Sequence, residues 1–467
     1  MVVVSNICSE QYSHSVIQWL QVIIYERFGH RFQLEQNSQD DLRLSIEDSR
    51  KSIVFDTLIP DFFTDTSDLS YCEWNASCES FAPVLGKPLP APGLNELSAP
   101  LIEQTADGYN IHYDILGLTY WMLSRQEEVG CTDLDEHGRF PASSSHAFKF
   151  GYLERPVVDE WLDILGQVLT RLWPQLTLKQ HQPRTLVSCD IDNPYLCYSK
   201  SFRKTARVVL GDLFKRRSPL AALKTLYRYN QIRCGNYNSD PYMSALDWIM
   251  DVNEAVGNKV SFNFITEQLD LTYDGCYSMG EPVIRDLLQR IYTRGHELGL
   301  HTSYTTIHDM EQTQREAEIL RKVMDEEGIS QRKLGGRQHY LRWETPTTAH
   351  NLDAAGMTYD STLGYADRPG FRCGTCHEYP MIDPIDKKLL NVRQRPLVLM
   401  ECSVIDMAYM GLGYSEQSMK YMHMIKKHCY KVGGDFTLLW HNSHLRNKED
   451  HSFYEELIQH KKFEERV

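Results

Sequence analysis

From Arg184 onward, short β-rich segments alternate with helical ones, and this alternation constrains the fold more than any other feature. Helical patterns over 281–294, 309–327, 346–355 and 416–431 separate most of the strand-like segments. Strands joined through helices indicate a parallel sheet with right-handed crossovers. Seven such units in roughly 280 residues favour a distorted (β/α)7-type barrel, with an open doubly wound sheet as the alternative. The seven strand segments are TLVSCD, KVSFNFI, ELGLH, KLGGRQH, GMTYD, PLVLMECSV and DFTLLWH.

The first part of the chain, residues 1–180, predicts a smaller α+β domain that precedes a barrel domain at 185–467. Two strand-like runs, DLRLSIED and SIVFDTLI, are followed by two helical patterns, DILGLTYWMLSRQEE and PVVDEWLDILGQVLTRLW. Catalytic residue types do not gather convincingly here. Asp135 and His137, in the polar loop DEHGRFPASSSHAF, are typical of solvated turn residues. We therefore expect the chemistry to lie in the second domain.

The composition excludes some classes of function. The chain carries a formal net charge of −14, so we expect no general affinity for nucleic acid. The N-terminal segment MVVVSNICSEQYSHSVIQWL lacks the features of a signal peptide, and no run approaches the ~20 apolar residues of a membrane span. Twelve cysteines without a regular framework are typical of free thiols in a reducing compartment. We therefore predict a cytoplasmic protein.

Ionisable side chains follow six of the seven strand segments. In a (β/α) barrel the carboxyl ends of the strands meet on one face, where active sites form. A single Asp there is more often a turn former, and a lone His is more often a buried, hydrogen-bonded side chain. Their recurrence at strand after strand favours a shared site. In chain order they are Asp190, Asp192, His301, Arg337, His339, Asp360, Glu401 and His441.

The segment SCDIDNP places two carboxylates on one face. Side chains alternate along an extended segment, so Asp190 and Asp192 point the same way. Two carboxylates side by side repel each other unless a cation or a guanidinium offsets their charge. A metal bound by one carboxylate, with the other free as a base, removes this conflict. Arg337 is able to orient the free carboxylate through a bidentate contact.

Five segments, in this order, resemble the motifs of the polysaccharide deacetylase (NodB homology) family: SCDIDNP, GHELGLHTSY, GGRQHYLRW, TYDSTLGY and TLLWH. The resemblance covers about 185–445. The first half, with LSRQEE and DEHGRFP, resembles an uncharacterised domain that precedes a bacterial subgroup of these enzymes. The family implies a distorted (β/α) barrel, a divalent metal that is usually zinc, and hydrolysis of N-acetyl groups on sugar polymers.

The resemblance also implies roles for individual residues. Asp190 matches the catalytic base and Asp192 a metal ligand. His301 matches the first metal histidine, Arg337 the arginine that positions the base, and His441 the catalytic acid. Glu401 stands where the family often has an acidic group that tunes this histidine. The expected substrate contacts are Tyr304, Tyr340, Asp360 and Trp440.

One position departs from the family. Thr305 stands where the second metal histidine belongs, one helical turn from His301, and its neutral hydroxyl is a poor substitute. We expect His339, at the end of the next strand, to supply the missing ligand. In a helix, His308 would lie about 10.5 Å along the axis from His301, too far to share a zinc ion. Water at the vacant position, or loss of the metal, are the alternatives.

These expectations favour a metal-dependent hydrolase, with Zn²⁺ as cofactor, that removes an N-acetyl group from a sugar in surface polysaccharide assembly. The substrate is then an N-acetylated saccharide, which can be lipid-linked. The rival is an inactive carbohydrate-binding or scaffolding protein that kept the barrel and lost the metal. Hydrolysis of a non-sugar C–N bond is a third reading.

A basic helical insertion is expected at about 196–240. Residues 200–233 hold ten Lys or Arg against one acid, Asp212, although the whole chain is acidic. One interpretation of this concentration of basic residues is a helical face exposed to solvent. A peripheral contact with an anionic membrane surface, or with a phosphate-bearing saccharide, is the sharper interpretation.

Overall fold

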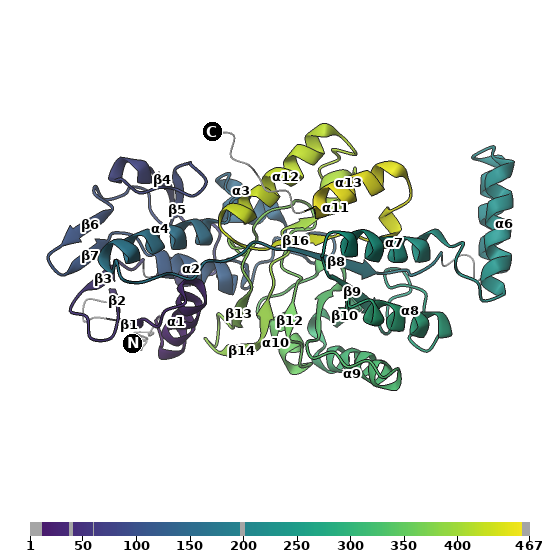
Figure 1. Ribbon diagram of the computed structural model, residues 1–467, viewed down its shortest axis with the longest axis horizontal. Coiled ribbons are helices and arrows are strands. Elements are labelled where there is room, and N and C mark those ends of the chain that lie inside the picture. The colour runs from purple at the N-terminus through teal and green to yellow at the C-terminus, as the bar shows by residue number, and fades with distance from the viewer. Residues whose placement is uncertain (1–11, 37–40, 59, 197–200, 460–467) are drawn as a thin grey trace, which may run out of the picture.

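A computed structural model describes residues 12–36, 41–58, 60–196 and 201–459. A smaller N-terminal domain lies beside a curled, half-barrel sheet of nine strands, and helices cover that sheet (Figure 1). Lys200 and the first eleven residues, which bear on the expectations for the basic insertion and the N-terminus, lie outside the described residues.

The nine strands run in the order β13-β14-β12-β11-β10-β9-β8-β16-β15. Neighbours pair in parallel, except β13 and β14, which are antiparallel. The strands are β8 Thr185–Ile191, β9 Val260–Ile265, β10 Glu297–Thr302, β11 Gly335–Gln338, β12 Tyr359–Asp360, β13 Tyr379–Ile382, β14 Leu389–Gln394, β15 Leu399–Met400 and β16 Phe436–Leu439.

Each of the seven segments expected from the sequence contains a strand, and these strands are neighbours in the order that a barrel requires. In PLVLMECSV, however, only Leu399–Met400 is a strand, and Glu401–Ile405 forms the helix α11. The sheet, however, begins at β13 and ends at β15, so its two edges lie where a barrel would close. The antiparallel pair β13–β14 joins β12 in place of β15. The structure therefore shows a half-barrel and does not confirm the expected (β/α)7-type barrel.

Two glycines let the central strands approach closely. A Cβ atom on Gly335 would lie 1.9 Å from the ring of Tyr359 on β12, and one on Gly336 would lie 2.1 Å from the carbonyl oxygen of Leu300 on β10. Both distances are below van der Waals contact, so larger side chains would force the strands apart. The two glycines of KLGGRQH thus fix the position of Arg337, the residue directly after Gly336.

Helices follow the strands as the periodicity predicts. α8 buries Ile284, Leu287, Leu288 and Ile291, which recur at helical spacing. α9 begins after Asp309, whose side chain accepts a hydrogen bond from the Gln312 N–H. The helices of the second half, apart from α5 and α6, are α7 Pro241–Ala255, α8 Pro282–Thr293, α9 Met310–Glu326, α10 Thr347–Ala354, α11 Glu401–Ile405, α12 Glu416–Lys431 and α13 Lys448–Ile458.

The N-terminal domain is α+β, as expected. Its main sheet runs β1-β2-β3-β7-β6, with only β3 and β7 parallel, and β4 pairs with β5. The strands are β1 Gln33–Gln36, β2 Leu42–Ser45, β3 Ser52–Phe55, β4 Tyr71–Trp74, β5 Leu89–Pro92, β6 Ile102–Thr105 and β7 Gly108–Ile111. The helices are α1 His14–Phe28, α2 Ile115–Ser124, α3 His146–Lys149 and α4 Val157–Leu172.

The two domains share buried contacts. The indole nitrogen of Trp19 on α1 donates a hydrogen bond to the carbonyl oxygen of Pro380. The hydroxyl of Tyr120 on α2 donates one to the carbonyl oxygen of Pro384. A buried ion pair joins Glu128 to Arg372 at 2.8 Å. One continuous hydrophobic core therefore extends from α1 to α13.

Two findings bear on the expectations from composition. Among the described residues, no helix combines the length and hydrophobicity that a membrane crossing requires. Cys276 is disulfide-bonded, so the expectation of free thiols throughout is wrong at this position. Nine other cysteines are free.

Candidate metal and acid–base site

Three metal-ligating side chains converge at the carboxyl ends of the central strands. Asp192 follows β8, His301 lies on β10, and His339 follows β11. The Asp192 Oδ1 atom lies 3.4 Å from His301 Nε2 and 3.7 Å from His339 Nε2. The strand pairing that sets His301 beside Arg337 brings His339 to the same edge. The sequence predicts these three residues as ligands, and the structure brings them together; we call them the triad.

Each histidine of the triad is oriented through its other ring nitrogen. His301 Nδ1 lies 2.8 Å from the Arg337 carbonyl oxygen, and His339 Nδ1 lies 2.9 Å from Asp274 Oδ1. A proton on each Nδ1 satisfies these acceptors and leaves both Nε2 lone pairs facing Asp192. This arrangement is the one in which proteins fix metal-binding histidines.

The triad fits a divalent cation. Donors about 2.1 Å from a tetrahedrally coordinated zinc ion lie about 3.4 Å apart, which is close to the separations found here. Within the described residues, Asp192 Oδ1 is buried without a hydrogen-bond partner, a state that costs free energy unless a cation or a donor satisfies it. Two imidazoles and one carboxylate are a common ligand set for zinc. The residues present are therefore compatible with such an ion.

Asp190, the second carboxylate of SCDIDNP, is buried beside the triad and held by its Oδ1 atom. Arg337 donates to Oδ1 at 2.9 Å, and the amide of Asn263 donates to it at 2.7 Å. The other oxygen of Asp190, Oδ2, lies 3.7 Å from His301 Nε2 and therefore faces the triad. Arg337 is itself fixed by the carbonyl oxygen and the hydroxyl of Ser361. One carboxylate oxygen is anchored and the other faces the reactive region.

The charges in this region hold both carboxylates ionised. Burial alone would raise the pKa of Asp190, but Arg337 and His301 outweigh it and lower the pKa below its usual value. Burial also opposes ionisation of Asp192, and its contacts with the triad histidines lower its pKa well below the usual range. Because His301 lies between two carboxylates, its pKa rises despite burial.

His441, at the end of β16, completes the expected set. Its Nδ1 lies 2.6 Å from Glu401 Oε1, so Nδ1 donates to the carboxylate and Nε2 remains available. Burial would lower the pKa of His441, but the Glu401 carboxylate outweighs it and raises the pKa well above the usual value. The charge of His441 also helps to lower the pKa of Asp190 and of Asp192, which places the three groups in one electrostatic unit.

An aromatic wall borders the triad. Tyr340 lies 4.8 Å from the His339 ring, and Tyr304 stacks on Tyr273 with 4.2 Å between ring centroids. His137, from the N-terminal domain, lies 4.7 Å from Tyr340, and its Nδ1 lies 3.1 Å from the Tyr304 hydroxyl. We call Tyr273, Tyr304, Tyr340 and His137 the aromatic wall. Flat rings beside a polar centre suit the apolar faces of sugar rings.

The backbone of this wall is strained. Tyr340 has φ +61° and Leu341 φ +55°, in the left-handed region that non-glycine residues seldom adopt. Arg139, from the N-terminal domain, donates to the Tyr340 carbonyl oxygen at 3.0 Å, and Arg342 donates to the carbonyl oxygen of His137. Strain of about 1–3 kcal/mol at such a residue persists only where its surroundings impose it.

Four residues singled out in the sequence lie elsewhere. Asp360 is buried and accepts hydrogen bonds from the Thr362 backbone and hydroxyl, and Trp440 is fully buried against Tyr454. Thr305 is exposed. His308 is exposed and pairs with Glu344 at 3.0 Å.

Several site residues were missed in the sequence. Asn263 carries a readable signal, because it is a polar residue within the apolar strand VSFNFI, and all of that strand is buried. A Cβ atom on Gly299 would lie 2.0 Å from Asn263 Oδ1, so this glycine makes room for it. Asp274 and Tyr273 lie in a loop without any periodic pattern, and His137 and Asp135 were interpreted as solvated turn residues. Asp135 instead holds Arg139, with 2.7 Å between Oδ2 and Nε.

Other reactive clusters lie outside the triad. Cys402, Asp406 and His444 place ligand atoms within 4.8 Å of one another, next to Glu401. Asp159, Cys376 and His377 form a further group, but Arg27 lies 3.3 Å from Asp159 and disfavours a second cation. Glu401, Cys402 and His441 form a third group. Among the described residues, the triad is the metal-capable group that lies beside the carboxylate anchored by Arg337.

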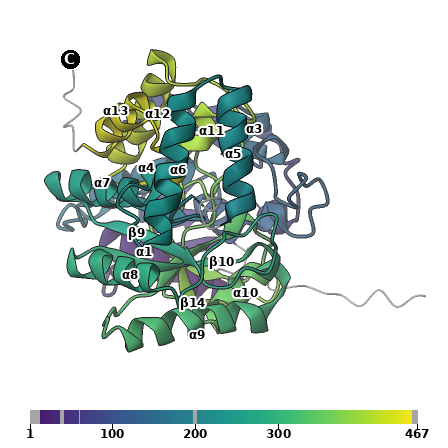
Figure 2. The same ribbon diagram turned by 90° about the vertical axis from the view of Figure 1, so that its right-hand side faces the viewer.

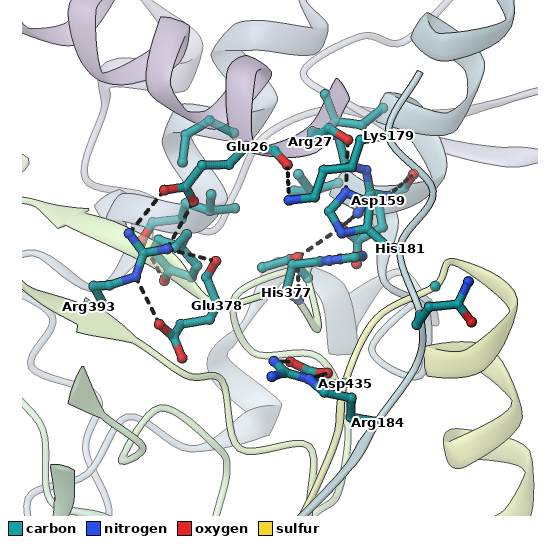
Figure 3. Close-up of a pocket in the computed structure, with 18 residues that line it drawn as sticks. Glu26, Arg27, Asp159, Lys179, His181, Arg184, His377, Glu378, Arg393 and Asp435 are labelled. Atoms are coloured by element: carbon teal, nitrogen blue, oxygen red, sulfur yellow. Dashed lines mark hydrogen bonds and ion pairs between the residues drawn. The ribbon is translucent and has the colours of Figure 1, made fainter. Parts of the chain in front are cut away.

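A cavity of about 450 Å³ lies between the domains, lined by charged residues (Figure 3). Arg393 contacts both Glu26 and Glu378, and Arg184 pairs with Asp435 at 2.6 Å. Arg184 precedes β8 and Asp435 precedes β16, so this cavity lies at the amino ends of those strands, opposite the triad. We interpret it as a feature of the domain contact.

Comparisons with known proteins add little. A model of a family of unknown function, DUF7033, matches residues 6–174, which agrees with the expected uncharacterised N-terminal domain. A solved structure described as a "putative polysaccharide deacetylase from Mycobacterium smegmatis" is similar at 13% sequence identity and a TM-score of 0.38, covering 61% of this chain and 84% of that one. No curated protein matches the chain. A likeness this distant carries no information about function.

Proposed function

We propose that the chain is a metal-dependent hydrolase that removes an N-acetyl group from a sugar. The observation that carries this proposal is the triad beside the anchored carboxylate of Asp190, with a second acid–base group, His441, acting electrostatically on both Asp190 and Asp192. Asp190 is anchored through Oδ1, and His441 is anchored through Nδ1. Amide hydrolysis needs a base for the attacking water and an acid for the departing nitrogen.

Asp192, His301 and His339 would hold the ion, most simply Zn²⁺. A divalent ion in such a site supplies a Lewis acid that polarises a carbonyl and lowers the pKa of water. The free Oδ2 of Asp190 takes one proton from the attacking water, and the oxygen adds to the acetamide carbon. His441 gives its Nε2 proton to the nitrogen as the C–N bond breaks. The products are acetate and the free amino sugar.

The aromatic wall supports a saccharide as the substrate. Tyr340 lies 4.8 Å from the ring of the triad residue His339 and is only partly buried, and an aromatic ring in such a place suits the C–H face of a pyranose. Tyr304 is stacked between Tyr273 and Arg342 and supports this wall from behind. We leave Asp360 and Trp440 out of the substrate contacts, because both side chains are buried in packing. An intermediate of surface polysaccharide assembly, including a lipid-linked one, is the substrate that we propose.

The test separates metal binding from turnover. Purified wild type should contain about one tightly held metal ion per chain, and Asp192→Ala should lose it. Asp190→Asn should keep the metal. Its rate of acetate release from N-acetylhexosamine oligosaccharides should fall at least ~100-fold, since general acid–base catalysis contributes about 10²–10⁴-fold to the rate. His308→Ala serves as a matched histidine control that should change neither.

Three outcomes would count against the proposal. Retained turnover in Asp190→Asn would remove this residue as the base. Wild type without bound metal would favour the non-catalytic, carbohydrate-binding alternative. A metal-loaded protein that releases no acetate from any N-acetylated sugar would point to a different C–N bond.

A further inference from the structure

The basic insertion forms a helical hairpin of α5 (Phe202–Phe214) and α6 (Pro219–Arg233). It stands at one end of the long axis of the molecule (Figure 1), and the two helices lie side by side across that end (Figure 2). We call these two helices the basic hairpin. Its place at the tip leaves a broad face open to other molecules.

The inside of the basic hairpin is small and polar. Asp212 on α5 is buried and accepts hydrogen bonds from the Thr225 hydroxyl at 2.9 Å and from Arg216 at 2.8 Å. Thr205 and Ala222 are buried as well. Tyr229 and Ile232 of α6 are also buried, but most of the hairpin's large apolar side chains are not.

Those large apolar side chains face outward instead. Phe214 is 78% exposed, Leu220 64% and Leu223 63%. Single exposed apolar residues are ordinary, but a group of them on one surface usually marks an interaction site. The full set is Phe202, Leu210, Leu213, Phe214, Leu220, Leu223, Leu226 and Tyr227.

Helical geometry places most of this set on one side of each helix. At about 100° per residue, Phe202, Leu210 and Leu213 fall within about 80° on α5, and Leu220, Leu223 and Tyr227 within about 60° on α6. The group on α5 lies about 100° from the centre of that helix's buried positions, Thr205 and Asp212. The group on α6 lies about 170° from the centre of Ala222, Thr225, Tyr229 and Ile232. Both groups therefore lie away from the buried side of their own helix.

Positive charge surrounds this apolar side. The exposed basic residues of the hairpin and its connecting turn are Arg203, Lys204, Arg207, Lys215, Arg216, Arg217, Lys224 and Arg233. The one acid, Asp212, is buried and already paired. The whole chain has net charge −14, so the hairpin is a local reversal of sign.

We propose that the basic hairpin docks on an anionic lipid bilayer. Helices with an apolar face and a Lys/Arg-rich flank lie in the membrane interface, with the apolar side chains among the acyl chains and the charges at the headgroups. Charge excludes a second copy of the chain as the simplest occupant, since two basic hairpins repel each other. A nucleic acid would leave the leucines in water.

Co-sedimentation with vesicles tests the docking. The full chain should bind vesicles of phosphatidylcholine with 30% phosphatidylglycerol far better than pure phosphatidylcholine, and salt should weaken binding because the charges are screened. Each basic residue near an anionic surface changes binding roughly fivefold. Replacing Arg203, Arg207, Arg217 and Lys224 with Gln should therefore weaken binding by at least ~100-fold. The matched control replaces four exposed arginines outside the hairpin, Arg31, Arg43, Arg50 and Arg332, and should bind like wild type.

A second pair of variants tests the apolar side. Phe214→Ser with Leu220→Ser and Leu223→Ser keeps the charge and, since these side chains are exposed, leaves the fold intact, yet should weaken binding at least tenfold. Leu223→Trp should add a blue-shifted emission component with anionic vesicles only.

The docking proposal would be overturned by equal binding to both vesicle types or by unchanged binding of the Gln variant. Salt-sensitive binding with no effect of the Ser variant would reduce the contact to charge alone and overturn insertion. Concentration-dependent dimers that the Ser variant abolishes, without vesicle binding, would assign the apolar side to a second copy. Metal content and acetate release are not read in these assays, so their outcome is independent of the proposed function.

Discussion

At the residue scale, the contact between Glu401 and His441 sets the protonation state of the proposed acid. Glu401 is 1% exposed and accepts from both the ring and the backbone N–H of His441. A general acid works only while it is protonated, so activity should fall as pH rises through the pKa of His441. Because Glu401 raises that pKa, wild type should stay active above the usual titration range of histidine near pH 6.5.

Glu401→Gln should therefore move the alkaline limb of the kcat/KM profile to lower pH. Without the Glu401 charge, the largest effect that opposes burial is lost, so the pKa of His441 falls and the loss of activity relative to wild type should grow as pH increases. Metal content should stay unchanged, and the exposed Glu416→Gln serves as control. A uniform loss at every pH would mean that Glu401 has only a structural role.

At this scale, the sequence predicts the site residues that lie at the ends of strands, but few of the other residues in the site. Asp192, His301 and His339 could be proposed together because parallel strands end at one edge. Asp274 could not, because it reaches His339 from a loop whose path no periodicity predicts. The anchoring side chains of a site come from the tertiary structure.

At the element scale, the loop DEHGRFP brings the N-terminal domain to the aromatic wall. Asp135 holds Arg139, Arg139 holds the strained Tyr340 backbone, and His137 contacts Tyr304. His137→Ala should raise KM for an N-acetylated oligosaccharide by roughly 2- to 10-fold, since an aromatic contact contributes about 0.5–1.5 kcal/mol. The value of kcat should change much less, because this ring does not touch the triad's ligand atoms.

Steady-state kinetics on His137→Ala and on His14→Ala, an exposed histidine of α1, measure this effect. A drop in kcat with KM unchanged would contradict a substrate-positioning role for the loop.

Local periodicity in the sequence predicted helices such as α9 and α12 almost to the residue. It missed β13, which is four residues long and contains Pro380, and β14, whose buried positions include the polar residue Gln394.

At the scale of the whole molecule, the two domains depend on each other. The segment LSRQEE is not a surface pattern, because Arg125, Glu127 and Glu128 are all buried. Glu128 lies between Arg125 and Arg372, and Arg372 is 244 positions further along the chain. No local reading of the sequence could supply this partner. Together with DEHGRFP, it makes both N-terminal motifs parts of the domain contact.

Glu128→Gln should therefore destabilise the whole chain. Removing one partner of a buried ion pair leaves the other charge uncompensated and costs about 3–5 kcal/mol. Burial would raise the pKa of Glu128, but Arg372 and Arg125 outweigh it and lower the pKa below its usual value. The stability that the carboxylate contributes is thus present at neutral pH and is lost as pH falls through the lowered pKa.

Urea unfolding at pH 7 and near pH 4 measures this effect. The difference in free energy of unfolding between Glu128→Gln and wild type should be smaller near pH 4 than at pH 7. The control, Glu136→Gln, whose native side chain is 88% exposed, should unfold like wild type at both pH values. Equal stability of Glu128→Gln and wild type at pH 7 would show that the ion pair does not hold the domains together.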